Sequence, residues 1–174
     1  MSTVSLQGLI KEDERVRRAI KRLKHTSLDI DSLWSELSSM HATRGVRALS
    51  TKKVLGSSVS VLVDAKLTDS SFRSRAVEIK IKVLKEVLDR DSILKDLRKY
   101  ILTAFSKRMK KSYSTITAQK NYVDVLLENY STKSTEMHNL MKIADLVIDD
   151  IDQAGWALKM IQETLATLQK ERYE

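Results

Sequence analysis

The clearest structural signal in this chain is MKIADLVIDDIDQAGWAL, residues 141–158. Apolar or small side chains recur in it at steps of three and four, which is the heptad pattern of helices that pack side by side. The positions of this seam are Met141, Ala144, Ile148, Ile151, Gly155 and Leu158, with a continuation at Leu165 and Leu168. The pattern predicts a long helix over about 135–172 whose apolar edge needs a partner, from its own chain or from another copy.

Gly155 is unusual within this pattern, because a glycine inside a helix costs about 1 kcal/mol relative to alanine. It lies on the seam and precedes Trp156. We therefore expect that two backbones approach closely at this point or that the helix bends there. The seam residues from Met141 to Leu165, together with Trp156, are candidate oligomerisation residues.

The composition favours long helices over sheets. The chain has 174 residues, no proline and four glycines, so the residues that usually mark tight turns are nearly missing. We expect an all-α fold of long antiparallel helices with a heptad-like C-terminal helix.

Apolar periodicity predicts where the other helices lie. We expect them at residues 15–25, capped by Asp13, and at 29–40, 59–68 and 70–112. Residues 59–68 also alternate like a strand, but no second strand-like run is present to pair with them. A Ser/Thr-rich break is expected within 113–120, followed by a helix from Val123 that is interrupted near 131–134.

Four segments follow from these patterns and from the charge. They are a basic N-terminal helical pair (1–42), a basic linker (43–58), a basic helical body (59–120) and an acidic C-terminal helical oligomerisation region (121–174).

The formal charge is divided along the chain. Residues 1–120 contain 26 Lys and Arg against 13 Asp and Glu, whereas residues 121–174 contain 5 against 10. A basic body suggests a polyanionic partner, and an acidic apolar tail suggests a protein partner. A homo-oligomeric ring would collect the basic surfaces of several subunits into one track.

The candidate nucleic-acid-binding residues are cations near aromatic rings. Cations follow phosphates, and rings stack on unpaired bases, as single-stranded DNA binding requires. The main cluster is Lys107, Arg108, Lys110 and Lys111, between Phe105 and Tyr113. Further candidates are Arg73, Arg75, Lys80 and Lys82 in the body, and Arg17, Arg18, Lys21 and Arg22 near the N-terminus.

Each of these clusters has an alternative interpretation. The cluster from Lys107 to Lys111 could be a solvated helix end whose cations complement the helix dipole. The N-terminal helix could lie on an anionic membrane, although its apolar face has no aromatic residue. The N-terminal helical pair could also form a helix-turn-helix, although its turn has no glycine.

Catalysis finds little support in the sequence. The three histidines have no metal-ligand spacing, and no phosphate-binding glycine motif is present. Cysteine is absent, as is an apolar run long enough to span a membrane. We expect no enzyme, no catalytic residue, no metal and no cofactor, and a cytoplasmic location (the host cytoplasm if a phage encodes the chain).

The segment from Ile151 to Glu163, IDQAGWALKMIQE, resembles the C-terminal helix of the phage recombination mediators, the UvsY family. The shared spacing consists of an isoleucine, a glycine four residues later, an aromatic, a small residue, an aliphatic and a lysine, here Ile151, Gly155, Trp156, Ala157, Leu158 and Lys159. The likeness covers about 30 residues. The tyrosine-tyrosine-serine-glycine segment of that family is absent, so its DNA-binding residues are not carried over.

Residues 70–97, SSFRSRAVEIKIKVLKEVLDRDSILKDL, are similar to the central helices of small terminase subunits of tailed phages. The shared pattern is an arginine before a glutamate-aliphatic pair, here Arg75, Glu78 and Ile79. Both families are helical, form rings and handle phage DNA.

The first resemblance implies a phage-type recombination mediator, which binds single-stranded DNA, displaces a single-strand-binding protein and loads a recombinase. The second implies a small terminase subunit that binds duplex packaging sites and a large terminase. A third hypothesis, from the charge alone, is a helical structural or adaptor protein that binds an acidic protein partner.

Overall fold

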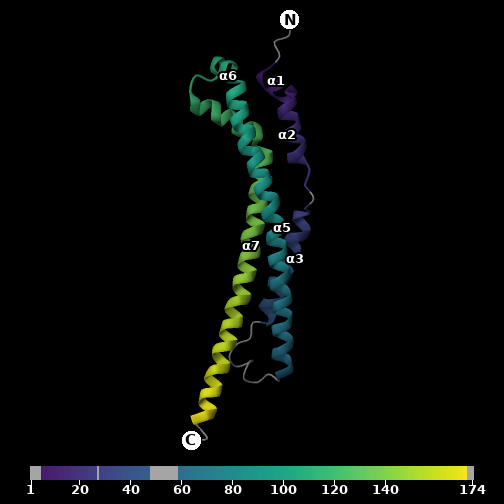
Figure 1. Cartoon of the computed structure of the whole chain (residues 1–174), viewed down its shortest axis with the longest axis vertical. Helices are drawn as coiled ribbons and strands as arrows, with labels where there is room; N and C mark the ends of the chain where they lie inside the picture. Colours follow the sequence, from purple (N-terminus) through teal and green to yellow (C-terminus); the bar gives the residue numbers. More distant parts are fainter. Residues whose placement is uncertain (1–4, 27, 48–58, 172–174) are drawn as a thin grey trace. The chain divides into compact units, whose positions relative to one another are not determined.

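The structure, a computed structural model, describes residues 5–26, 28–47 and 59–171. Its regular elements in these ranges are six helices (Figure 1). They are α1 (Leu6–Glu12), α2 (Glu14–Lys24), α3 (Ile30–Arg47), α5 (Val59–Ala104), α6 (Ser106–Ser112) and α7 (Ile116–Glu171). The all-α class predicted from composition is confirmed. Within the described ranges, none of the helices is apolar over a length that would cross a membrane.

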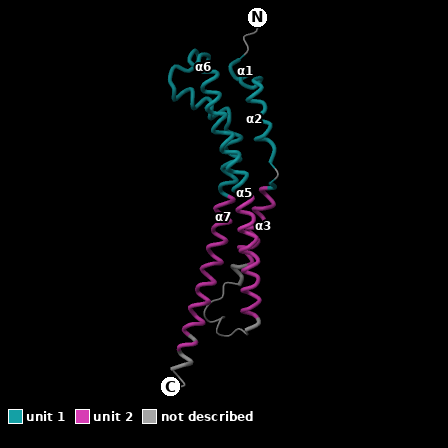
Figure 2. Tube along the Cα trace, viewed as in Figure 1, with its two compact units in different colours: residues 1–29, 83–139 teal, residues 30–82, 140–174 magenta. Residues whose placement is uncertain are grey.

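The chain divides into two compact units, and each unit joins segments that are far apart in sequence (Figure 2). Unit 1 contains residues 1–29 and 83–139, and unit 2 contains residues 30–82 and 140–174. Helices α5 and α7 therefore contribute to both units. These boundaries differ from the four consecutive segments into which the sequence was divided.

Ion pairs show the direction in which α5 and α7 pack in unit 2. Arg73 on α5 pairs with Asp152 on α7, and Lys80 on α5 pairs with Asp145 on α7. Seven residues forward along one helix correspond to seven residues back along the other. The two long helices are therefore antiparallel in this unit.

The same direction holds in unit 1. There Asp91 on α5 contacts His138 on α7, and Arg98 on α5 pairs with Asp124 on α7. Helices α1, α2 and α6 add further apolar side chains to this pair. One apolar cluster of the core of unit 1 consists of Ile10, Val16, Leu23, Ile93, Leu94, Leu97, Ile101, Met109, Val123 and Leu127.

The predicted seam lies largely inside the chain itself. Buried apolar side chains in unit 2 come from α3, α5 and α7, and they are Leu37, Met40, Ala76, Ile79, Leu140, Ala144, Val147, Ile148 and Ile151. Of the other seam positions, Met141 and Leu158 are half-buried, whereas Gly155 and Trp156 are exposed. The side chain of Leu165 is not among those that the structure describes. The chain's own helices thus cover Ala144, Ile148 and Ile151.

Several helix ends differ from the prediction. Helix α1 was not expected, and it begins where the Ser5 side chain accepts a hydrogen bond from the Gly8 amide, at 3.1 Å. The predicted cap of α2 is confirmed, because the Asp13 carboxylate accepts from the Val16 amide at 3.0 Å. Helix α3 continues to Arg47, into the predicted linker, and residues 48–58 lie outside the described residues.

The predicted helices over 59–68 and 70–112 are one helix, α5, which ends at Ala104. The helical interpretation of 59–68 is confirmed. Phe105 then leaves the helical conformation, with φ of −102° and ψ of 8°, so α6 is a separate helix.

The interruption predicted near 131–134 was wrong, since α7 is continuous there. The hydroxyls of Thr132 and Thr135 donate to the carbonyl oxygens of Glu128 and Ser131, one turn earlier, at 3.1 Å each. Such bonds satisfy a hydroxyl without breaking a helix.

Arg90 connects α5 to the end of α2. Its side chain is only 1% exposed, and its Nη1 donates to the carbonyl oxygen of Leu23 at 2.7 Å. Its Nε and Nη2 are buried and have no hydrogen-bond partner among the described residues. The C-terminal end of α2 carries a partial negative charge from its carbonyl groups, and this charge attracts the Arg90 guanidinium.

Substitutions at Arg90 separate packing from charge. Arg90→Met keeps most of the volume and removes a partly unsatisfied buried charge, so the free energy of unfolding should stay within about 1 kcal/mol of wild type. Arg90→Ala leaves a cavity and should cost about 2–5 kcal/mol. Urea denaturation measures both. Equal losses in the two variants would show that the hydrogen bond to Leu23, and not the packing, holds α2.

Candidate nucleic-acid interface

The formal charge of the folded chain is concentrated in unit 1. Unit 1 has 18 Lys and Arg against 11 Asp and Glu, a net charge of +7. Unit 2 has 13 against 12, a net charge of +1, because it combines cations of the middle of the chain with acids of the C-terminal region. A surface for a polyanion is therefore expected in unit 1.

The candidate cations of unit 2 are paired with carboxylates. Arg73 donates to both carboxylate oxygens of Asp152, at 2.7 and 2.9 Å. Arg75 donates in the same way to Glu36, at 2.6 and 3.0 Å. Lys80 and Lys82 pair with Asp145 and Glu78, at 2.5 and 2.6 Å. Arg73 and Lys80 connect α5 to α7, Arg75 connects α5 to α3, and Lys82 pairs within α5, so the first role of these cations is within the unit.

The ion pairs lower the pKa values of their carboxyl groups. The hydrogen bond from Arg75 lowers the pKa of Glu36, and the hydrogen bond from Arg73 lowers the pKa of Asp152. The bonds from Lys82 and Arg75 lower the pKa of Glu78. A lowered pKa stabilises the folded state above the unfolded-state pKa, and this stabilisation is lost as the pH falls through the folded-state pKa.

Unit 2 should therefore lose stability in acid. The ordinary pKa values are 4.5 for Glu36 and 3.8 for Asp152, so we expect the melting temperature to decline below about these values and not above them. Glu36→Gln should lower the melting temperature at neutral pH and reduce the further decline in acid. Circular dichroism melts of both proteins across the acidic range measure this. An equal acid decline in the variant would show that Glu36 contributes nothing to it.

The cations of α6 are placed differently from those of unit 2. Lys107, Arg108, Lys110 and Lys111 are exposed, and no carboxylate in the described part of the chain lies within ion-pair distance of them. Met109, in the middle of the same helix, is fully buried in the core of unit 1. One buried side chain thus holds a seven-residue helix whose four cations face solvent.

The connection between α6 and α7 is held by polar contacts. The side-chain amide of Gln119, which is only 6% exposed, donates to the carbonyl oxygen of Tyr113 at 3.0 Å. The Thr115 hydroxyl accepts from the Ala118 amide at 3.1 Å and so caps α7. The connection between α6 and α7, next to the α6 cations, is therefore fixed by hydrogen bonds.

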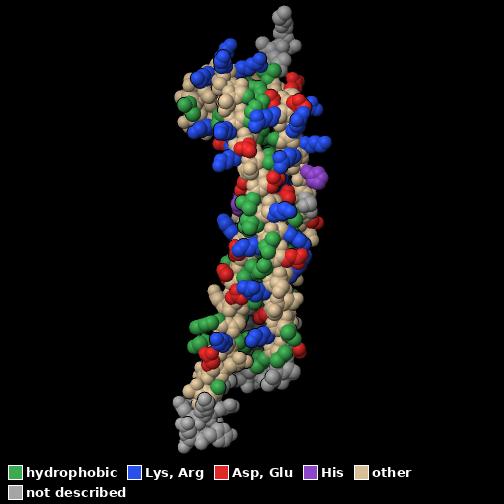
Figure 3. Space-filling model, in the orientation of Figure 1, with side chains coloured by type: hydrophobic (Ala, Val, Ile, Leu, Met, Phe, Trp, Pro, Cys, Tyr) green, Lys and Arg blue, Asp and Glu red, His purple; other side chains and the backbone are tan. Residues whose placement is uncertain are grey.

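No acidic residue occurs between Asp96 and Asp124. The seven cations of this interval are Arg98, Lys99, Lys107, Arg108, Lys110, Lys111 and Lys120. Figure 3 shows Lys and Arg side chains gathered around α6. Lys99 and Lys120 were not among the predicted binding residues, and the acid-free interval is the sequence signal that points to them.

The rings of the two aromatic candidates, Phe105 and Tyr113, are partly covered by other side chains of the chain. Phe105 packs against the core of unit 1. The ring of Tyr113 lies against that of Tyr122, with 4.8 Å between the ring centroids. Tyr113 remains half-exposed, so it keeps surface that a base could contact. Stacking on Phe105 is not supported by this arrangement.

The cations of α2 form a second, mixed surface. Arg17 and Lys21 are exposed and have no ion pair with the described residues, whereas Arg18 pairs with Glu14 and Arg22 with Asp89. Exposed pairs of this kind contribute little to stability and can exchange partners.

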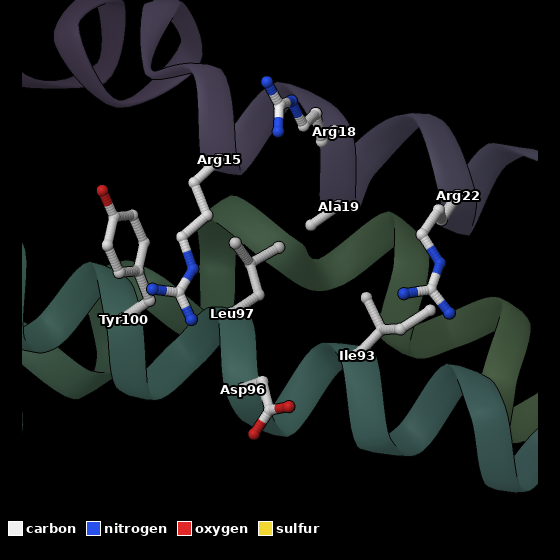
Figure 4. A pocket seen from close by; sticks show the side chains of 8 residues that line it. All are labelled: Arg15, Arg18, Ala19, Arg22, Ile93, Asp96, Leu97 and Tyr100. Carbon is white, nitrogen blue, oxygen red and sulfur yellow. The ribbon is translucent and has the colours of Figure 1, made fainter.

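A shallow groove of about 320 Å³ lies between α2 and α5 (Figure 4). Arg15 and Arg22 extend from α2 toward α5, and Ala19, Ile93 and Leu97 lie between them. The guanidinium of Arg15 covers the ring of Tyr100, 4.4 Å from its centroid. Asp89 pairs with Arg22 and Glu14 pairs with Arg18, so this groove is less suited to a continuous phosphate chain than α6.

Comparisons with known proteins identify no relative of this chain. No family model, no curated protein and no solved structure matches this chain. The resemblances to recombination mediators and small terminase subunits therefore stay predictions from short stretches of sequence.

Proposed function

We propose that this protein binds nucleic acid through α6 and the acid-free interval around it. The observation that carries the proposal is the set of four exposed cations of α6, which have no carboxylate partner among the described residues and are fixed in place by the buried Met109. Phosphates are the ligands that such a cluster suits, since each contact releases condensed counterions. The charge of unit 1 favours the approach of a polyanion to this part of the chain.

The specific form of the proposal is a phage-type DNA-binding accessory protein that acts as a recombination mediator. It would hold single-stranded DNA along its phosphates, displace a single-strand-binding protein and pass the strand to a recombinase. Self-association, up to a ring, would gather several α6 surfaces and add avidity. The support for this form is the likeness around Gly155 and Trp156 and the half-exposed ring of Tyr113.

The alternatives differ in the partner of the same surface. A small terminase subunit would use α6 on duplex DNA. An adaptor would use it on an acidic protein, and nucleic acid would then bind weakly at every salt concentration.

Neutralising α6 should weaken binding and flatten its salt dependence. For single strands, log affinity falls with log salt by about 0.7 per phosphate contact. The quadruple variant Lys107→Gln, Arg108→Gln, Lys110→Gln and Lys111→Gln should therefore reduce the slope by up to about 3. Fluorescence anisotropy with a labelled oligothymidylate over a salt series measures it.

A matched control removes the same charge elsewhere. Lys66, Lys85, Lys95 and Lys142 are exposed and have no ion pair with described residues, so their change to Gln alters the net charge equally. The control should keep most of the wild-type slope. If both quadruple variants lose the same amount, the attraction is a property of net charge, and α6 is not the site.

Strand preference tests the mediator form. Wild type should prefer single strands, and Tyr113→Leu should reduce the preference, because a stacked base contributes about 1–3 kcal/mol. Competition between single and double strands of equal length at one salt concentration measures it. A clear preference of wild type for duplex would support the terminase alternative.

A further inference from the structure

Helix α7 presents an apolar patch beyond the buried part of unit 2. Trp156 is 67% exposed and Met160, one turn later, is 44% exposed. A hollow lined by Asp149, Asp152, Gln153 and Trp156 lies beside the indole ring. A tryptophan exposed to this extent is the kind of side chain that anchors protein interfaces.

The fold of a single chain gives no reason for glycine at position 155. The φ of Gly155 is not positive, and a Cβ added there would meet no atom of another described segment within 4 Å. Alanine would therefore fit, and alanine is the better helix former. The backbone approach expected from the sequence is not made by the chain's own described residues. A second polypeptide that passes close to α7 at this point would account for the glycine.

The residues of this face are complementary to themselves in reverse order. Asp152, Gly155, Trp156 and Lys159 follow one another at helical spacing on one side of α7. An antiparallel copy related by a two-fold axis between Gly155 and Trp156 would place each Trp156 opposite the other Gly155. The same axis would place each Asp152 opposite the other Lys159.

The charged residues at this face have capacity for such a contact. The ion pair of Lys159 with Glu163 is long, at 3.8 Å, and both side chains are mostly exposed. Asp152 holds Arg73, but half of its side chain remains exposed. A carboxylate has room for more than two donors, so Asp152 can accept from a lysine of a second copy while it holds Arg73.

We propose that two copies of this chain pair antiparallel through α7, with Trp156 of each copy packed over Gly155 of the other. The contact is isologous, so it closes at a dimer, and a ring would need a further interface. It concerns the self-association within the proposed function and does not depend on nucleic acid. The occupant is a second copy because the charges and the sizes of the side chains match when the same face is reversed.

Sedimentation velocity of the full chain over a concentration series, combined with thermal melts, tests this pairing. Gly155→Ala should raise the melting temperature of the dilute monomer, since the helix is better formed, yet raise the dimer dissociation constant about tenfold or more. Trp156→Ala should weaken the dimer by a similar factor. Leu146→Ala removes another exposed side chain of α7, 66% exposed, and should leave the dissociation constant unchanged.

Two outcomes would overturn the pairing. One is a wild-type protein that stays monomeric at tens of micromolar, and the other is a Gly155→Ala variant that associates as wild type does. Binding of a short oligothymidylate distinguishes this proposal from the proposed function. Gly155→Ala should bind it with wild-type affinity per copy, and the quadruple α6 variant should still dimerise.

Discussion

The antiparallel packing of α5 against α7 is the contact on which the rest of the structure depends. These helices are 46 and 56 residues long, and each has an apolar edge that water would otherwise reach. In unit 2 the buried residues of the pair include Ile79 and Ile148, and in unit 1 they include Leu97 and Leu127. The shorter helices complete each core from a further side.

The same packing determines which charged side chains of the chain remain available to a partner. Along the sequence, a basic body precedes an acidic tail. In the fold, the acidic part of α7 lies beside cations of α5, and pairs such as Arg73 with Asp152 use both charges within unit 2. The four cations of α6, Lys107, Arg108, Lys110 and Lys111, have no acidic neighbours in sequence and no carboxylate partner among the described residues. The basic surface is therefore smaller than the sequence suggested, and it is centred on helix α6.

The sequence predicted those features that depend on near neighbours. Helical periodicity and the Asp13 cap involve residues three or four apart, and both were found correctly. The continuity of α7 could not be predicted in the same way, because the buried hydroxyl of Ser134 donates to Asp91, which is 43 residues away. Without that distant acceptor, a buried serine in a Ser/Thr-rich stretch favours a break.

In the candidate site, too, features that depend on near neighbours were predicted and features that depend on distant residues were not. The exposed cations of α6 could be read from the sequence, since charge and exposure usually coincide. The packing of Phe105 could not, because it depends on a core assembled from α1, α2, α5 and α7. The seam was recognised, but its partner was not, since an apolar edge looks the same whether its own chain or another copy covers it.

The short turn around α6 also has a consequence for how the chain folds. Contacts between α5 and α7 near this turn join residues close in sequence, such as Arg98 and Ser131, which are 33 residues apart. Contacts in unit 2 join distant residues, such as Arg73 and Asp152, which are 79 apart. Closing a short loop costs less conformational entropy than closing a long one, and each contact shortens the loop that remains for the next. We therefore expect the two long helices to meet first beside α6 and to zip from there, so that unit 1 forms before unit 2.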